Sequence, residues 1–205
     1  METFWPEADP DASRNNLNVA ICGLRKTLAR VNPSFSYVVF QSGEYLLNPL
    51  LKIWLDSEAF SAHVDKARAL ERRGEKDAAL HEYRAAESLY HTELLVEDRY
   101  EDWLLDMRQH FQLAYVAVLE RLASHYFDHG DYPACVTVCG KMLAIDACNE
   151  GSHRRFMRCY SRLGQPYLAV RQYHRCLKAL ADELEMTPSQ ETVSLFERLR
   201  RAQPL

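Results

Sequence analysis

The hydrophobic positions of the first fifty residues predict one amphipathic helix followed by a β-hairpin. The turn-forming run 32–34 ends the helical pattern that begins at Asp11 and reaches Val31. Two β-prone runs, 37–40 and 44–47, then lie on either side of a short turn at 41–43, which is typical of a hairpin. The apolar residues of the helix recur at helical spacing as one stripe, Leu17, Ala20, Ile21, Leu24 and Leu28.

Further along the chain, a repeated pattern predicts pairs of helices joined by turns at a glycine. Gly130 and Gly164 are 34 residues apart (164 − 130), the period of a tetratricopeptide unit. An earlier copy surrounds Gly74, with Leu70, Ala79, Tyr83 and Leu89 at matching offsets. It has Glu87 where the later copies have a leucine, and we expect Ala86 to fill that space instead. The two later copies align Leu122 with Phe156, Tyr126 with Tyr160, Cys135 with Ala169, Cys139 with Tyr173, Leu143 with Leu177 and Ile145 with Ala179. We expect the aligned tyrosines and leucines to pack in the core.

The remaining helices follow from the gaps around these copies. Gly74 and Gly130 are 56 residues apart (130 − 74), so about one extra helix's worth of chain is inserted, predicted as a loop and a helix starting near Arg99. Pro188 separates a helix over 168–185 from a last helix, Ser189 to Arg201. Three copies are enough for a stacked array with a continuous core. The predicted fold is therefore all-α, with domains at 1–50 and 51–205.

The composition favours a helical protein and excludes several other classes. The chain has only 7 glycines and 8 prolines in 205 residues, which is little for a turn-rich β protein. No apolar run reaches the length of about eighteen residues that a membrane helix needs, and the first ten residues lack the pattern of a signal peptide. Because a chain of this size does not need disulfides, its 6 cysteines are expected to be reduced thiols in the cytoplasm.

The first predicted helix carries residues that suit DNA. Arginine bridges phosphates or reads guanine, and asparagine pairs with adenine. A helix with these residues on one face, followed directly by a hairpin, is what a winged helix offers to DNA; the alternative is a solvated face. The candidate DNA-binding residues are Arg14, Asn15, Asn18, Arg25 and Lys26.

A second candidate surface is a basic ridge. Arg154, Arg158 and Arg162 lie four residues apart, so they share one side of a helix. We expect this ridge to bind an acidic partner segment or DNA phosphates; the alternative is a solvated face paired with the acid-rich stretch 75–106.

Catalytic and metal patterns are weak. Cys135 and Cys139 have helical spacing, but they align with packing positions of the repeat, and no Cys-x-x-Cys motif accompanies them. No phosphate-binding loop, zinc-protease motif or paired acid motif is present in the sequence. We expect a protein that is not an enzyme, without a catalytic site, metal or cofactor.

Two sets of motifs resemble a known family, the antibiotic-regulatory bacterial transcription activators. Phe4-Trp5-Pro6, Arg14-Asn15-Asn16-Leu17 and Leu24-Arg25-Lys26-Thr27-Leu28 resemble the second half of that family's winged-helix domain, and "SGEYLLNP" resembles its wing. Residues 56–199 resemble the bacterial transcriptional activator domain. There the motifs are Asp56-Ser57-Glu58-Ala59-Phe60, "YHTELLVEDRYEDWLLDMRQ" and "ALADELEMTPSQETVSLFERL".

The resemblance implies a partial winged-helix segment followed by a tetratricopeptide-like array. It implies a DNA-binding transcription regulator whose repeats mediate self-association or contact with RNA polymerase. In the family, strands and two helices precede the recognition helix, and this sequence begins after them. The apolar stripe of the first helix is therefore expected to be covered in an oligomer that hides Leu17 and Ile21. The alternative function is a protein-binding adaptor of the tetratricopeptide type that does not bind DNA.

Overall fold

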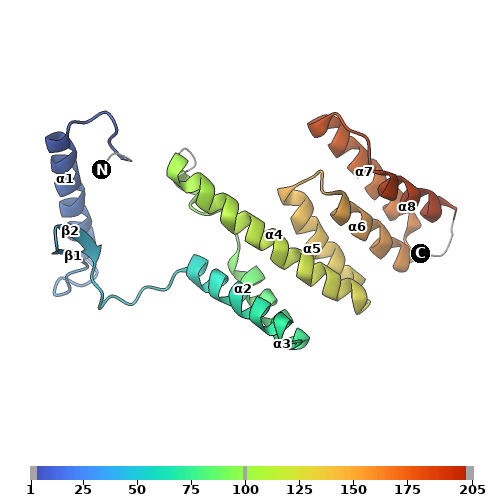
Figure 1. The fold of residues 1–205 in the computed structure, drawn as a ribbon, viewed down its shortest axis with the longest axis horizontal. Helices are drawn as coiled ribbons and strands as arrows, with labels where there is room; N and C mark the ends of the chain where they lie inside the picture. Colours follow the sequence, from blue (N-terminus) through green and yellow to red (C-terminus); the bar gives the residue numbers. More distant parts are fainter. Residues whose placement is uncertain (1–3, 99–100, 202–205) are drawn as a thin grey trace. The chain divides into compact units, whose positions relative to one another are not determined.

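The computed structural model describes residues 4–98 and 101–201 and divides the chain into two compact units, Met1–Leu55 and Asp56–Leu205. Figure 1 shows a helix and a two-stranded sheet in the first unit and a series of paired helices in the second. The division falls after Leu55, close to the expected boundary after residue 50. No helix in the described part of the chain is long and apolar enough to cross a lipid bilayer.

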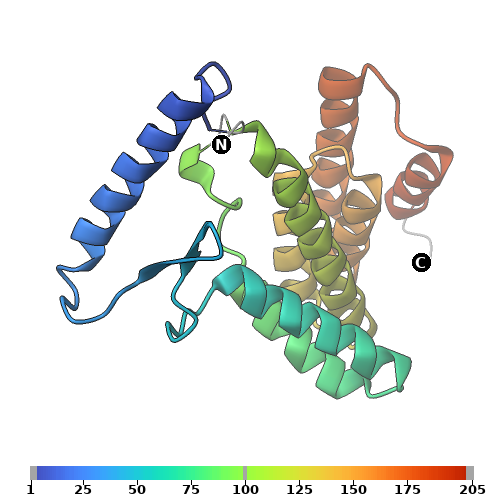
Figure 2. The same cartoon turned by 60° about the vertical axis from the view of Figure 1, so that its left-hand side comes forward.

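The first unit contains the predicted helix and hairpin (Figure 2). Helix α1 spans Pro10–Leu28, and its N-cap Asp9 accepts hydrogen bonds from the backbone N–H groups of Asp11 and Ala12 at 3.0 and 2.8 Å. Strands β1 (Val38–Gln41) and β2 (Glu44–Leu47) pair antiparallel, with Gln41 opposite Glu44. Both residues between them, Ser42 and Gly43, have positive φ, at 54° and 88°, as a two-residue hairpin turn of the I′ type requires.

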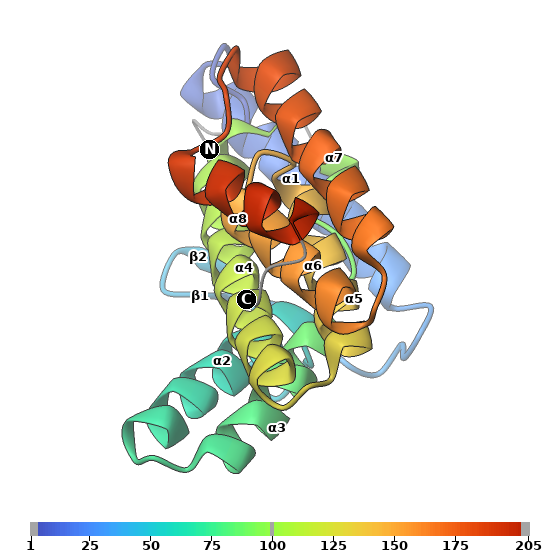
Figure 3. The same cartoon turned by 90° about the vertical axis from the view of Figure 1, so that its right-hand side faces the viewer.

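The second unit is the predicted all-α repeat array. Its helices are α2 (Asp56–Arg72), α3 (Lys76–Leu89), α4 (Leu105–Asp128), α5 (Tyr132–Ile145), α6 (Glu150–Arg162), α7 (Pro166–Leu184) and α8 (Gln190–Arg200). Each helix packs against the next, and the pairs α2–α3, α4–α5 and α6–α7 form the three repeats. Figure 3 shows α8 lying across the α6–α7 end of the array, where it contacts both helices.

The same backbone conformation makes the turn inside each of the three repeats. Gly74, Gly130 and Gly164 have φ values of 79°, 76° and 70°, a region that residues with a side chain avoid. In each turn the residue after the glycine donates its N–H to a carbonyl five residues back, as Asp131 does to Tyr126 at 2.9 Å. The 34-residue glycine spacing therefore marks recurring helix ends, which is why it predicted the repeats.

Most of the repeat positions are core positions. Leu122, Cys135, Cys139 and Phe156 are buried in one continuous cluster that also includes Leu119, Val118 and Tyr83. Tyr126, Leu143 and Tyr160 pack against it half-buried. Ala86 is fully buried, as expected, and Glu87 forms an ion pair with Lys141 of α5. The prediction for Leu177 is wrong: the residue is 40% exposed, because the buried side of α7 is the one that carries Cys176 and Leu180, and Leu177 lies about 100° around the helix from Cys176.

The insertion differs from the expected extra helix. It forms a loop with two 3₁₀ turns, Val96–Asp98 and Asp102–Leu104, and α4 then runs without interruption from Leu105 into the second repeat. The expected helix start at Arg99 lies outside the described residues. Arg108 of α4, only 6% exposed, donates hydrogen bonds to the carbonyl oxygens of Leu94, Leu95 and Asp98 at 2.8, 2.7 and 2.9 Å. The loop is therefore held against α4 by one buried guanidinium group.

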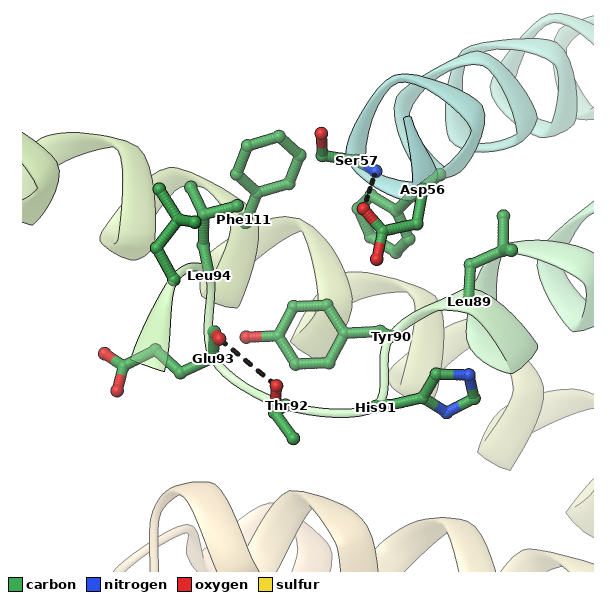
Figure 4. A pocket seen from close by; sticks show the side chains of 11 residues that line it. Asp56, Ser57, Leu89, Tyr90, His91, Thr92, Glu93, Leu94 and Phe111 are labelled. Carbon is green, nitrogen blue, oxygen red and sulfur yellow. Dashed lines mark hydrogen bonds between the residues drawn. The ribbon is translucent and has the colours of Figure 1, made fainter. Parts of the chain in front are cut away.

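This loop also closes over a small pocket of about 190 Å³. Figure 4 shows the ring of Tyr90 directed into it, with Phe111 of α4 and Asp56 at the start of α2 on other sides. The Tyr90 ring stacks on that of Tyr115, with centroids 4.0 Å apart. Burial raises the pKa of Tyr90. The hydroxyl therefore stays protonated, and the ring serves mainly as a packing element of the first repeat.

A buried histidine predicts how stability depends on pH. His153 of α6 is 3% exposed, its Nε2 lies 2.9 Å from the carbonyl of Ala147, and its Nδ1 lies 2.8 Å from the amide nitrogen of Gln172. The amide must donate and the carbonyl must accept, so the ring is neutral with its hydrogen on Nε2. Burial lowers its pKa below the usual 6.5. The unfolded chain therefore takes up a proton first as pH falls.

We expect the free energy of unfolding to decrease as pH falls from about 7.5 to about 5.5, by on the order of 1 kcal/mol from this residue. His153→Gln should be less stable at the higher pH but lose less stability over the interval. Thermal unfolding at both pH values measures this difference. His81→Gln, which changes an exposed histidine of α3, is the control and should keep the wild-type slope. A wild-type slope in His153→Gln would contradict the interpretation.

Candidate nucleic-acid interface and partner surfaces

In the first unit, α1 and the hairpin are joined by two side chains of the helix. The guanidinium of Arg25 donates from Nε and Nη2 to the carbonyl oxygen of Val38, at 3.2 and 2.9 Å. The same group lies over the ring of Tyr45, 5.5 Å from its centroid. The Tyr45 hydroxyl donates to Oδ1 of Asn18 at 3.0 Å. These contacts fix β1 and β2 against one side of α1.

The five residues predicted to bind DNA lie in two groups on α1. Arg14 and Asn18 line an open cleft of about 690 Å³ between the helix and the hairpin, and Arg25 contacts the hairpin on the same side. Asn15 and Lys26 are exposed, and at about 100° per residue they lie on the adjoining side of the helix. The geometry thus separates residues that position the hairpin from residues that face outward.

Tyr45 is a functional candidate that the sequence analysis missed. It is half-buried, stands opposite Phe40 across the hairpin, and their ring centroids are 4.8 Å apart. It also contacts both Asn18 and Arg25. An aromatic residue between charged and apolar neighbours in a β-prone run is the signal that could have found it, because such a ring often faces the element that packs on the strand.

The apolar stripe of α1 is only partly covered inside its unit. Leu17, Ile21 and Leu28 are half-buried, whereas Leu24 and the neighbouring Val19 are 43% and 65% exposed. Ser13 is the buried residue of this helix. An apolar surface of this kind is available for contact with another protein surface.

The basic ridge of α6 is largely engaged with α8. Arg154 lies 3.1 Å from a carboxylate oxygen of Glu191 and donates to the Thr192 hydroxyl at 3.0 Å. Arg158 approaches the second oxygen of Glu191 at 3.8 Å. Arg162, at the end of α6, is exposed. The carboxylates that pair with the ridge are thus Glu191 of α8 and, at 3.8 Å from Arg154, Glu150 of α6 itself, rather than acids of the stretch 75–106.

A polar cleft between α4 and α6 was also missed. It is lined by nine residues: Ala117, Glu120, Arg121, Ser124, Met142, Asn149, Gly151, Ser152 and Arg155, with a volume of about 410 Å³. Arg121 and Arg155 come from α4 and α6, one repeat apart, at matching offsets nine residues before Gly130 and Gly164. The recurrence of an arginine at this offset is the signal from which the cleft could have been predicted. The sequence alone does not say which side of each helix lines such a cleft.

Three of the cysteines lie together in the core. Cys135, Cys139 and Cys159 are each fully buried, and the Cys135 thiol lies 3.3 Å from the carbonyl oxygen of Ala123. Hydrogen bonding to Cys135 and burial raise the pKa values of Cys139 and Cys159, so these thiols are neutral packing groups. Within residues 4–98 and 101–201, no cluster of three His, Cys, Asp or Glu residues is arranged to hold a metal ion.

Comparison with known proteins identifies the second unit. The family model described as the bacterial transcriptional activator domain matches residues 55–200, which confirms the resemblance drawn from the motifs of that region. No curated protein sequence matches the chain.

Two solved structures share the fold. One is Mycobacterium tuberculosis EmbR in complex with a low-affinity phosphopeptide, with a TM-score of 0.65 and 20% identity. The similarity covers 100% of this chain and 54% of the EmbR chain, so this chain spans about half its length. The other is the C-terminal TPR-containing domain of a Plasmodium falciparum FK506-binding protein, with a TM-score of 0.50 and 16% identity over 73% of this chain and 93% of that one. These similarities establish a tetratricopeptide-like fold.

Proposed function

Because this chain belongs to the bacterial transcriptional activator domain family, we propose that it is a DNA-binding transcription regulator of the antibiotic-regulatory type. The match over residues 55–200 carries the proposal. The helix and hairpin of the first unit support it, since a helix followed by a hairpin is the arrangement that a winged helix offers to the major groove and the backbone of DNA.

We propose different roles for the candidate residues according to their positions on α1. Asn15 and Lys26 are exposed and would contact a base edge and a phosphate. Arg14 and Asn18 would act at the cleft beside the hairpin. Arg25, whose guanidinium already donates to Val38, would orient the hairpin and contact DNA only with its remaining N–H groups.

The same proposal includes protein partners and a cytoplasmic location. Self-association would use the exposed apolar side chains of α1, Val19 and Leu24, beside the half-buried Leu17 and Ile21. The repeat array would contact the transcription machinery, with RNA polymerase as the expected partner. On the ridge of Arg154, Arg158 and Arg162, the exposed end at Arg162 and the half-exposed Arg158 would reach an acidic partner most readily.

DNA binding can be tested by fluorescence anisotropy of the chain with labelled duplex DNA over a series of salt concentrations. Binding should weaken steeply with salt, and Lys26→Ala should lower the slope of log K against log salt by about 1, the effect of one lost phosphate contact. Asn15→Ala should reduce discrimination between duplexes with less change in slope. Lys178→Ala, an exposed cation of α7 in the other unit, is the matched control and should bind as the wild type does.

Absence of binding at low salt would overturn the DNA-binding proposal. The alternative, a protein-binding adaptor with a tetratricopeptide-like fold, would then stand, because the array and its surfaces do not depend on α1. Equal loss of slope in Lys26→Ala and Lys178→Ala would instead mean that DNA binds through general charge rather than through the first unit.

A further inference from the structure

We propose that the polar cleft between α4 and α6 is a docking site for an extended acidic protein segment. The inference deepens the protein-contact part of the proposed function and names the chemistry of the partner. The cleft is distinct from the basic ridge, whose arginines Arg154 and Arg158 are paired with Glu191 of α8. In the cleft, by contrast, Arg155 is held in place by a hydroxyl group, and Arg121 is only weakly neutralised by Glu71.

The first cation, Arg155, is positioned by a hydrogen bond to α4. Its Nη2 donates to the hydroxyl of Ser124 at 3.0 Å, so α4 fixes the direction of the guanidinium. A guanidinium has five N–H donors in a planar fork that fits a carboxylate. The half-buried position of Arg155 leaves the group at the wall of the cleft. A preoriented arginine in a partly desolvated cleft binds carboxylate more strongly than a freely moving surface arginine.

The second cation, Arg121, has a weak internal partner. Its Nε lies 3.6 Å from a carboxylate oxygen of Glu71, and its side chain is 63% exposed. An exposed ion pair at this distance contributes little. The other oxygen of Glu71 accepts a hydrogen bond from Tyr83 at 2.9 Å, so this carboxylate has a partner without Arg121. Exchange of Glu71 for a carboxylate of an incoming segment would therefore cost little.

The surroundings favour an extended chain over a small anion. A second cleft, of about 460 Å³, shares Arg121 and Ser124 and continues over α4 to Lys76 at the start of α3. The first cleft reaches the start of α6, where Asn149 accepts from the N–H of Ser152 at 2.8 Å. The path thus leads between two helix N-termini, whose dipoles add to the positive potential of the side chains. Glu120 in the first cleft and Asp128 in the second limit the number of carboxylates that can bind.

The test uses the full chain and a fluorescein-labelled peptide of alternating glutamate and alanine, with the glutamine–alanine peptide of equal length as the uncharged control. We expect anisotropy to show binding of the acidic peptide alone, weakening with salt. Arg121→Gln and Arg155→Gln should each weaken it about tenfold. Glu71→Gln, which removes the competing carboxylate, should tighten it several-fold. Lys178→Gln should leave it unchanged.

The opposite signs of Arg121→Gln and Glu71→Gln keep the result independent of folding, because a damaged fold cannot tighten binding. Loss of binding in Arg162→Gln but not in Arg121→Gln would place the segment on the ridge and overturn the proposal. Equal binding of both peptides, or self-association of the chain that Arg121→Gln abolishes, would overturn it as well. DNA binding is tested with variants of α1, whereas this site is tested with an acidic peptide. Failure of the DNA-binding proposal and failure of this proposal are therefore distinguishable.

Discussion

Leu119→Ala is expected to lower the free energy of unfolding by about 2–5 kcal/mol, the usual range for truncation of a buried leucine. Leu119 is fully buried on α4, the helix that packs against both α3 and α5 and so joins the first and second repeats. Removing three carbon atoms there leaves a cavity with Val118, Leu122 and other members of the main core cluster around it. Arrays of this kind depend on contacts between neighbouring repeats, so the loss acts on two repeats at once.

The matched control is Leu113→Ala, six residues earlier on the same helix, because Leu113 is 63% exposed. Its effect should stay within about 0.5 kcal/mol, as for most surface substitutions. Urea unfolding followed by circular dichroism measures both values. Similar losses in the two variants would mean that the face of α4 assigned to the core is wrong. A loss confined to part of the transition would show that the repeats unfold separately.

The repeats were predictable because their signals are local. A glycine in a left-handed conformation and small residues where helices approach are requirements of single turns and single contacts. Gly74, Gly130 and Gly164 meet the first requirement, and Ala79, Cys135 and Ala169 meet the second. The hairpin was predictable for the same reason, since Ser42-Gly43 alone determines its turn.

The remaining features depend on contacts that no local pattern records. Arg25 and Lys26 are adjacent cations in the sequence, yet one donates to the hairpin and the other is exposed. Arg154 and Arg155 are also adjacent, but one faces α8 and the other faces α4. Sequence spacing places such residues on a helix side but does not say which element covers that side. The predicted ridge and the cleft beside α4 differ for this reason.

The insertion was predicted only in part, for a related reason, and gives the second large effect: the loop was expected, but the helix after it is the start of α4 at Leu105 rather than a separate helix. Its sequence suggested an extra helix, whereas its shape depends on backbone carbonyls that accept from Arg108 fourteen, thirteen and ten residues away. Arg108→Met keeps much of the apolar stem but removes every donor. A hydrogen bond to a charged group contributes about 1.5–3 kcal/mol, so opening of the loop should become easier by at least about 2 kcal/mol.

Cleavage by chymotrypsin measures this opening, because Leu94, Leu95 and Trp103 lie in the loop. When opening is fast, cleavage follows the population of the open form, so 2 kcal/mol corresponds to about 30-fold faster cutting. Arg121→Met is the control: it removes an arginine from the same helix that is 63% exposed and has one ion pair with Glu71. Its cutting rate should remain at the wild-type level.

Arg108→Lys separates charge from geometry. A lysine keeps the positive charge, but its compact ammonium group lacks the planar fork that reaches several carbonyl oxygens at once. We therefore expect cutting between the rates of the wild type and Arg108→Met. A wild-type rate in Arg108→Lys would show that charge alone holds the loop, and a wild-type rate in Arg108→Met would contradict the assigned role. If the midpoint of thermal unfolding stays constant while cutting accelerates, the loop opens independently of the repeats that it connects.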